Sequence, residues 1–293
     1  MIGRRILRLA VAAAVALGFL AALPLETVRA ENFAGLYVAL GDSYAAGPLI
    51  PDQVDLPCLR SNHNYPGLVA ADLRITAFRD VSCSSATTLD FTQSQSGSGG
   101  VPVPPQFDAL TSDTALVTLT IGGNDIGFAH IAGTCAAVSA TNPFGAPCES
   151  IYTAGGTDQI AAAVNATAPK IAAALRGIHT RAPHARVLLV GYLDILPEPG
   201  VASGCWPVVP IAVGDVTYLR GVELQLNQML SLQASQNGAT YVDSYTPSIG
   251  HDVCQIPLVK WVEGVVPIFP AAPLHPNQLG MQNVAYAVIA QIH

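Results

Sequence analysis

Five short runs of apolar and β-branched residues alternate with longer segments of helical periodicity along this chain. The runs lie at residues 36–40, 75–81, 115–121, 186–192 and 240–243. Apolar positions three and four residues apart predict helices at residues 65–73, 158–179, 216–234 and 279–292. A regular alternation of strands and helices is typical of a parallel sheet with helices on both faces. We therefore predict an α/β fold built around a five-stranded parallel sheet.

The first 30 residues have the features of a secretory signal peptide. Three arginines among the first eight residues precede an alanine-rich apolar stretch at 9–23, and small residues at 28–30 offer a cleavage site. The apolar stretch is short for a membrane span. We expect residues 1–30 to be removed on export, by the general or the twin-arginine route, with retention as a membrane anchor as the alternative. The expected location is secreted or in the cell envelope.

Residues 31–293 form a single domain in our prediction. They contain no internal repeat or long linker, and 263 residues suffice for one large core. Without the first 30 residues, nine basic and 19 acidic side chains remain, a formal net charge of −10. Such a chain is poorly suited to bind nucleic acid. We expect no nucleic-acid partner and a monomer, and we leave contact with the cell envelope or a membrane surface open.

All six cysteines follow residue 30, which fits an exported protein. Six cysteines allow fifteen pairings. Their spacing favours sequential pairing, which gives Cys58–Cys83, Cys135–Cys148 and Cys205–Cys254. The chain has no Cys-x-x-Cys motif, so a zinc or redox site is a minor alternative. We expect the disulfides to fasten long loops, at about 3 kcal/mol each in the chain-entropy model.

Polar residues follow the first three predicted strands. Gly41-Asp42-Ser43-Tyr44 follows the first, the Ser- and Thr-rich segment 82–88 the second, and Gly122-Gly123-Asn124-Asp125 the third. In parallel α/β sheets, ligands bind at the carboxyl ends of the strands. A helix that begins beside Ser43 would stabilise an oxyanion there. The alternative for Gly41 to Tyr44 is a simple turn.

Serine-based acyl transfer requires a nucleophile, a general base, a group that orients the base, and donors for the oxyanion. Ser43 is our candidate nucleophile. His275 is the candidate base, because it lies between Leu274 and Pro276 at the start of a predicted helix. The candidate oxyanion donors are the backbone N–H groups of Ser43 and Ser85 and the side-chain amide of Asn124. Asp42 and Asp125 are expected to fasten the turns that carry Ser43 and Asn124.

Three sequence blocks resemble the SGNH (GDSL-type) hydrolases, in particular the disulfide-containing secreted esterases and lipases of actinobacteria. The blocks are Gly41-Asp42-Ser43, Gly122-Gly123-Asn124-Asp125 and His275-Pro276-Asn277. Their order and spacing and the three cysteine pairs agree over nearly the whole chain after residue 30. The resemblance implies a flavodoxin-like three-layer α/β/α sandwich. It also implies hydrolysis of carboxylic esters without a metal or a cofactor.

The chain departs from the family pattern at two positions. Ser85 stands where the family usually has a glycine, and its N–H can serve if the backbone angles suit a residue with a Cβ. Ala272 stands where the family usually has the aspartate that orients the histidine. A backbone carbonyl preserves the correct histidine tautomer, and the resemblance makes the Ala272 carbonyl our candidate. The rivals are Asp252 or Glu263 folded back onto the ring, or a damaged active site.

The predicted function is that of a secreted serine esterase or lipase that acts on a small-molecule or lipid ester. Phe128, Trp206 and Trp261 are candidates for lining the acyl pocket. One alternative is a catalytically idle cell-surface or carbohydrate-binding module on the same fold. The other is an acyltransferase that passes the acyl group to an alcohol instead of water.

Overall fold

The computed structural model of this protein describes residues 35–198 and 205–292. The predicted signal peptide at residues 1–30 lies outside the described residues. Its assignment stays a prediction, and so does the division of the chain into a signal peptide and one domain. In the part of the chain that the structure describes, no helix is long and apolar enough to cross a membrane.

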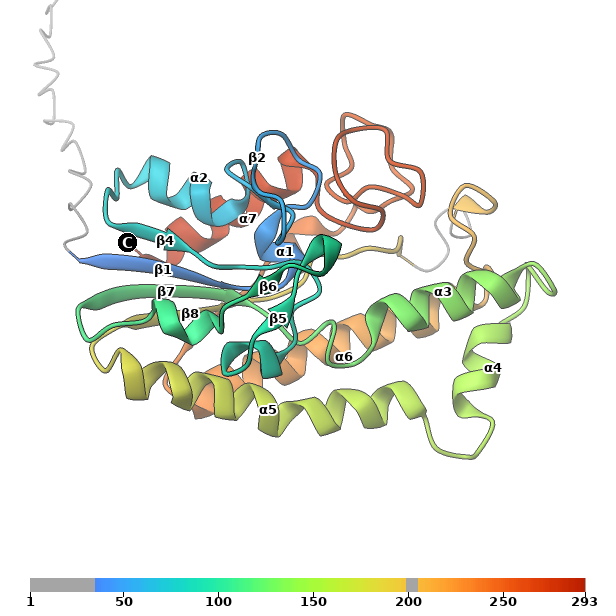
Figure 1. The fold of residues 1–293 in the computed structure, drawn as a ribbon. Coiled ribbons are helices and arrows are strands. Elements are labelled where there is room, and N and C mark those ends of the chain that lie inside the picture. Colours follow the sequence, from blue (N-terminus) through green and yellow to red (C-terminus); the bar gives the residue numbers. More distant parts are fainter. Residues whose placement is uncertain (1–34, 199–204, 293) are drawn as a thin grey trace, which may run out of the picture. The chain divides into compact units, whose positions relative to one another are not determined.

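A five-stranded parallel sheet forms the centre of the fold (Figure 1). Its strands are β1 (Leu36–Gly41), β4 (Phe78–Asp80), β7 (Thr114–Thr120), β8 (Arg186–Val190) and β9 (Thr240–Val242). They are ordered β4-β1-β7-β8-β9, and every neighbouring pair is parallel. The order 2-1-3-4-5 is that of flavodoxin-like proteins. The predicted fold class is therefore confirmed.

Two pairs of helices cover the sheet. α2 (Tyr65–Asp72) packs with α7 (Gln278–Ile292) on one face, and α5 (Gln159–Arg181) packs with α6 (Asp215–Gln236) on the other (Figure 1). β1 is buried along its whole length, as expected for a strand with helices on both sides. The largest fully buried apolar side chains of the core include Leu40, Leu116, Leu119, Ile121, Ile171 and Leu175.

Shorter elements lie in the connections. They are α1 (Ser43–Ala46), β2 (Gln53–Asp55), β3 (Arg60–Ser61), β5 (Gln95–Ser96), β6 (Pro102–Val103), α3 (Phe128–Ser139), α4 (Pro147–Thr153) and 3₁₀ turns at Thr88–Phe91, Ser98–Gly100, Gln106–Ala109 and Thr246–Ser248. The second predicted strand, 75–81, is shorter than expected. Ile75 still belongs to the turn that ends α2, because its N–H donates to the Ala70 carbonyl. The strand therefore begins only at Phe78.

The three predicted disulfides are confirmed as Cys58–Cys83, Cys135–Cys148 and Cys205–Cys254. The first joins the loop after α1 to the segment after β4. The second joins α3 to α4, and the third joins the loops that follow β8 and β9. All three therefore fasten segments beyond the carboxyl ends of the strands, where the candidate site lies.

Candidate active site

Ser43 and His275 meet at the carboxyl edge of the sheet. Ser43 is the first residue of α1, which begins where β1 ends. His275 lies just before α7, 232 residues further along the chain, and its Nε2 is 2.7 Å from the Oγ of Ser43. This is the hydrogen bond that joins a serine nucleophile to its general base.

A backbone carbonyl contacts the His275 ring, but it is not the one that we predicted. Nδ1 lies 2.7 Å from the carbonyl oxygen of Pro273. The Ala272 carbonyl instead accepts the backbone N–H of His275 at 3.1 Å. The prediction of Ala272 is wrong because its carbonyl accepts the backbone hydrogen bond that closes the turn. The carbonyl of the next residue, Pro273, is the one that contacts the ring. Since a carbonyl can only accept, Nδ1 carries the proton and Nε2 can accept from Ser43.

The two rival carboxylates are bound elsewhere. Asp252 accepts the N–H of Cys254 at 2.8 Å and the side chain of Gln255 at 2.9 Å. Glu263 accepts from the side chain of Asn277 at 2.8 Å and from the backbone N–H of Ile268 at 2.9 Å. The idea that either folds back onto the ring is therefore wrong. Glu263 supports the histidine loop through its backbone, because its N–H donates to the His275 carbonyl at 2.9 Å.

The residue before His275 has a strained backbone. Leu274 has a φ of 60°, a left-handed conformation that costs a bulky residue free energy. Two hydrogen bonds hold it there. The Tyr44 hydroxyl donates to the Leu274 carbonyl at 2.7 Å, and the Leu274 N–H donates to the Glu263 carbonyl at 3.1 Å. The direction of the His275 side chain is thus fixed from both sides of its backbone.

Partial burial favours the neutral form of the His275 ring. It lowers the pKa of the imidazole, and the hydrogen bond to the Pro273 carbonyl opposes this shift. A lowered pKa keeps the ring neutral near pH 7. The neutral ring is the form that can take the proton of Ser43.

The three candidate oxyanion donors lie around the same cavity as His275. The Ser43 N–H belongs to the first turn of α1, where a helix offers no internal acceptor. The side-chain nitrogen of Asn124 donates one hydrogen to the Ala86 carbonyl at 2.9 Å. Because an amide nitrogen carries two hydrogens, a second one remains for a ligand. Ser85 is exposed at the rim.

The cavity has a volume of about 460 Å³ and is mostly apolar. Its apolar walls come mainly from α3 with the loop before it and from α6, and include Ile126, Phe128, Ile131, Leu219, Val222 and Leu226. Of the predicted aromatic residues, Phe128 lines it. Among the described residues, the cavity lining does not include Trp206 or Trp261. Trp261 instead stacks on His251, with ring centroids 4.0 Å apart.

Comparisons with known proteins identify the family of this chain. The model of the GDSL-like lipase/acylhydrolase family matches residues 39–282. The chain belongs to this family. It is 42% identical over 255 residues to Lipase 2 of Streptomyces coelicolor. The aligned residues make up 85% of this chain and 83% of that protein. As a GDSL-like acylhydrolase, the protein is a carboxylic ester hydrolase.

Two solved structures of Streptomyces enzymes are similar over most of the chain. Phospholipase A1 from Streptomyces albidoflavus NA297 has a TM-score of 0.69 and 30% identity, and the match covers 88% of this chain and 98% of that one. The extracellular lipase from Streptomyces rimosus has a TM-score of 0.67 and 26% identity, with 88% and 99% covered.

The backbone conformation at Ser85 is one that favours the glycine usual at this position in the family. The φ of Ser85 is 68°, in the left-handed region. A Cβ approaches the following carbonyl oxygen in that conformation, at a cost of roughly 1–2 kcal/mol. Ser85 keeps the N–H that the glycine would supply. The substitution therefore costs this acylhydrolase backbone strain rather than a donor.

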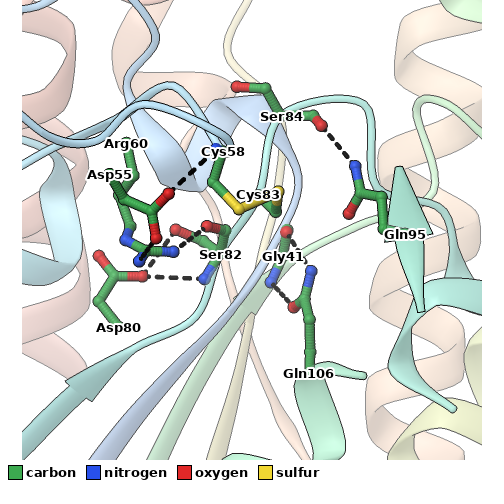
Figure 2. Close-up of a disulfide and its surroundings, with 10 residues drawn as sticks. All are labelled: Gly41, Asp55, Cys58, Arg60, Asp80, Ser82, Cys83, Ser84, Gln95 and Gln106. Carbon is green, nitrogen blue, oxygen red and sulfur yellow. Dashed lines mark hydrogen bonds and ion pairs between the residues drawn. A yellow bond between two sulfur atoms is a disulfide. The ribbon is translucent and has the colours of Figure 1, made fainter. Parts of the chain in front are cut away.

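The disulfide Cys58–Cys83 fastens the segment that leads to Ser85 (Figure 2). The Cys83 N–H donates to the Gly41 carbonyl, and the Ser84 N–H donates to the Cys58 carbonyl, both at 3.0 Å. The Gln95 side chain donates to the Ser84 carbonyl at 2.6 Å. These bonds tie the segment that carries Ser85, a candidate oxyanion donor, directly to Gly41, two residues before the candidate nucleophile.

Gly41 is held on its other side by Gln106 (Figure 2). The Gln106 side chain accepts the Gly41 N–H at 2.7 Å and donates to the Gly41 carbonyl at 2.9 Å. Gly41 has a φ of 132°, and a Cβ there would lie 2.5 Å from the Thr120 carbonyl oxygen. Only glycine lets the GDSL turn approach β7 this closely.

The structure adds Tyr192, which the sequence analysis missed. Its buried hydroxyl donates to Asp42 at 2.5 Å and accepts the Gly123 N–H at 2.8 Å. Asp42 also accepts the Tyr44 N–H at 2.9 Å, and burial raises the pKa of Asp42 to about 7. Tyr192 thus joins the nucleophile turn to the Asn124 loop. A polar residue at the end of the fourth predicted strand was the available signal.

Asp125 lies where we expected it, beneath the Asn124 loop. Its carboxylate accepts the hydroxyl of Thr88 at 2.6 Å and the Thr88 N–H at 2.9 Å. Lys170 on α5 approaches the same carboxylate at 3.4 Å. Asp125 therefore links the Asn124 loop to the Ser- and Thr-rich segment after β4.

Proposed function

We propose that this member of the GDSL-like family is an exported serine esterase or lipase that forms an acyl-enzyme on Ser43. The observation that carries the proposal is the 2.7 Å distance between Ser43 Oγ and His275 Nε2. The proton on Nδ1 is donated to the Pro273 carbonyl oxygen, which lies 2.7 Å from Nδ1. Donors on Ser43, Ser85 and Asn124 line the same cavity.

Acylation begins when Ser43 Oγ attacks the ester carbonyl carbon and its proton moves to Nε2 of His275. The former carbonyl oxygen becomes an oxyanion, which the donors on Ser43, Ser85 and Asn124 stabilise. His275 then gives its Nε2 proton to the alcohol oxygen as the carbon–oxygen bond breaks. The alcohol leaves, and the acyl group stays on Ser43.

Deacylation repeats these steps with water. His275 takes a proton from the water, the hydroxide attacks the acyl carbon, and the Ser43 oxygen leaves with the proton from Nε2. The carboxylic acid is released and the free enzyme is restored. The Pro273 carbonyl keeps the correct tautomer throughout, but as a neutral group it stabilises the imidazolium less than a carboxylate would.

Lipid esters are the substrate class that we propose. The apolar cavity suits an acyl chain. Large apolar side chains are also exposed on the segment that leads to His275, with Ile256 exposed to 66%, Leu258 to 80% and Val266 to 80%. Exposed apolar side chains that are grouped on one segment are typical of contact with a lipid surface. Export is supported by the predicted signal peptide and three disulfides.

A fluorophosphonate probe tests the nucleophile. We expect it to label one serine of the folded protein and to fail with Ser43→Ala. Hydrolysis of p-nitrophenyl esters should fall by at least 10³-fold in Ser43→Ala and in His275→Ala. A folded wild-type protein that neither takes the label nor turns over esters of any acyl length would refute the proposal. That result would favour the idle-module alternative.

Product analysis separates hydrolase from transferase. With glycerol present, an acyltransferase forms a glycerol ester, whereas a hydrolase releases the free acid. A panel of graded acyl length separates a short-chain esterase from a lipase.

A further inference from the structure

Glu223 is an acidic residue on an apolar wall of the cavity. α6 presents Leu219, Val222, Glu223 and Leu226 to the cavity, at the spacing that places side chains on one helix face. The other three are apolar. A carboxyl group in such a wall costs free energy unless it has hydrogen-bond partners.

The contacts of α6 place Glu223 near the end of β8. One turn further along the helix, the Asn227 side chain accepts the Tyr192 N–H at 2.8 Å and donates to the Tyr192 carbonyl at 3.1 Å. Glu223 accepts the N–H of Ile195, which lies just beyond Tyr192, at 3.2 Å. The Tyr192 ring packs against the Tyr44 ring, with centroids 5.0 Å apart. Glu223 therefore lies in the part of the cavity beside the residues that carry the Ser43–His275 pair.

One oxygen of this carboxyl group is unpartnered. Oε2 accepts from Ile195, whereas Oε1 is buried and, within the described residues, has no hydrogen-bond partner. Arg220, one turn earlier, does not neutralise Glu223, because its guanidinium binds Asp194 at 2.6 and 2.7 Å and the Leu196 carbonyl at 2.6 Å. The last side-chain torsion of glutamate is broad, so the carboxyl group of this cavity-lining residue can rotate.

Burial favours the neutral form of the Glu223 carboxyl group. Burial raises the pKa of its carboxyl group well above the usual range, and the charge of Asp194 adds to this shift. The Ile195 N–H and Arg220 oppose it. A neutral carboxyl group can donate one hydrogen bond and accept another. A hydroxyl group is the ligand that complements both functions.

We propose that Glu223 is a specificity-determining residue that binds a hydroxyl group on the acyl chain, so that the enzyme prefers hydroxyacyl esters to unsubstituted esters of equal length. This inference rests on the proposed function, since it assigns the cavity to the acyl group. An unsubstituted chain leaves the buried oxygen unpartnered, and sites with unpaired polar groups discriminate strongly against such ligands. A hydroxyl group supplies the missing partner.

The test compares kcat/KM for p-nitrophenyl octanoate with kcat/KM for octanoates that carry one hydroxyl at successive carbons. We expect wild type to prefer at least one hydroxylated ester about tenfold. Glu223→Leu should abolish the preference, by slowing the hydroxylated ester and speeding the unsubstituted one. Glu223→Gln should retain most of it, because an amide also donates and accepts. Glu149→Leu is the matched control, since Glu149 is exposed on α4 and lies outside the cavity lining.

Three results would overturn the assignment. One is a wild-type enzyme that prefers the unsubstituted ester at every hydroxyl position, a result that needs no variant. Another is an equal loss on both esters in Glu223→Leu, which a purely structural bond to Ile195 would cause. The third is a preference that follows a hydroxyl on the alcohol portion, measured with hydroxyethyl and ethyl octanoate. If wild type hydrolyses no ester at all, the proposed function fails before this inference is reached.

Discussion

Tyr192→Phe removes one hydroxyl that joins the turn carrying Ser43 to the loop carrying Asn124. In the structure this hydroxyl donates to Asp42 at 2.5 Å and accepts the Gly123 N–H at 2.8 Å. Both partners are buried, and the phenylalanine ring fills the same space without either bond. The variant therefore isolates the two hydrogen bonds from the packing of the ring.

The expected loss of stability follows from the groups left unpaired. An unsatisfied buried N–H costs about 1–3 kcal/mol, and a hydrogen bond to a carboxylate contributes about 1.5–3 kcal/mol. We expect the free energy of unfolding to fall by about 3 kcal/mol. The pKa of Asp42, now about 7, should rise further, because the Tyr192 bond opposes the effect of burial.

The expected loss of activity follows from the position of Gly123, next to Asn124. A lost oxyanion donor costs on the order of 10²–10³ in rate, and a displaced donor costs less. We expect kcat to fall about tenfold with a smaller change in KM. Urea unfolding at pH 7 measures the stability, and hydrolysis of a short p-nitrophenyl ester measures kcat.

Tyr218→Phe is the matched control. Its hydroxyl also donates to a carboxylate, that of Asp158 at 3.0 Å, but Tyr218 is half-buried and is not one of the residues that line the cavity. We expect it to cost about 1 kcal/mol and to leave kcat unchanged. If Tyr192→Phe behaves like Tyr218→Phe in both assays, Tyr192 does not position the oxyanion loop.

Two further substitutions test the departures from the family pattern. Ser85→Gly should raise the free energy of unfolding by up to about 1 kcal/mol, because relief of left-handed strain outweighs the added freedom of the unfolded chain. The Ser85→Gly protein should keep its activity. Ser84→Gly, at a residue without a positive φ, should instead lower the free energy of unfolding. A Ser85→Gly protein that unfolds at lower urea than wild type would contradict this reasoning. The acid limb of the kcat/KM profile should have its midpoint below about pH 6.5, because burial lowers the pKa of His275 and only the neutral ring is active. Ala272→Asp should move that midpoint upward by placing a negative charge near the ring, and Ala272→Asn should not; equal midpoints in the two variants would show that residue 272 cannot reach His275.

The helices and strands were predictable because their signals are local. β7 follows directly from the β-branched segment that starts at residue 115, and the long helices follow from their apolar periodicity. β4 was the exception. Its first expected residues complete the turn after α2, where Arg74 has a φ of 54°, and nothing in their composition distinguishes this from a strand.

The residues of the candidate site were predictable for a different reason. Ser43, Asn124 and His275 each lie in a short block near a strand end or helix start, and the three blocks in order, rather than any one alone, indicated the candidate site. The pairing of Ser43 with His275 follows once the sheet is parallel, because the strand ends meet at one edge.

The amino-acid sequence by itself predicted the strands of the sheet, the candidate nucleophile and base, and the cysteine pairs, because apolar period, turn residues and spacing can be read along the chain. Only the tertiary structure decided that the Pro273 carbonyl holds His275, that Tyr192 joins Asp42 to Gly123, and that Glu223 faces the cavity with an unpartnered oxygen. These contacts depend on turn geometry to within one residue and on side chains up to 150 positions apart. Hydrogen bonds require atoms within about 3 Å of each other, and only the packed chain sets distances on that scale.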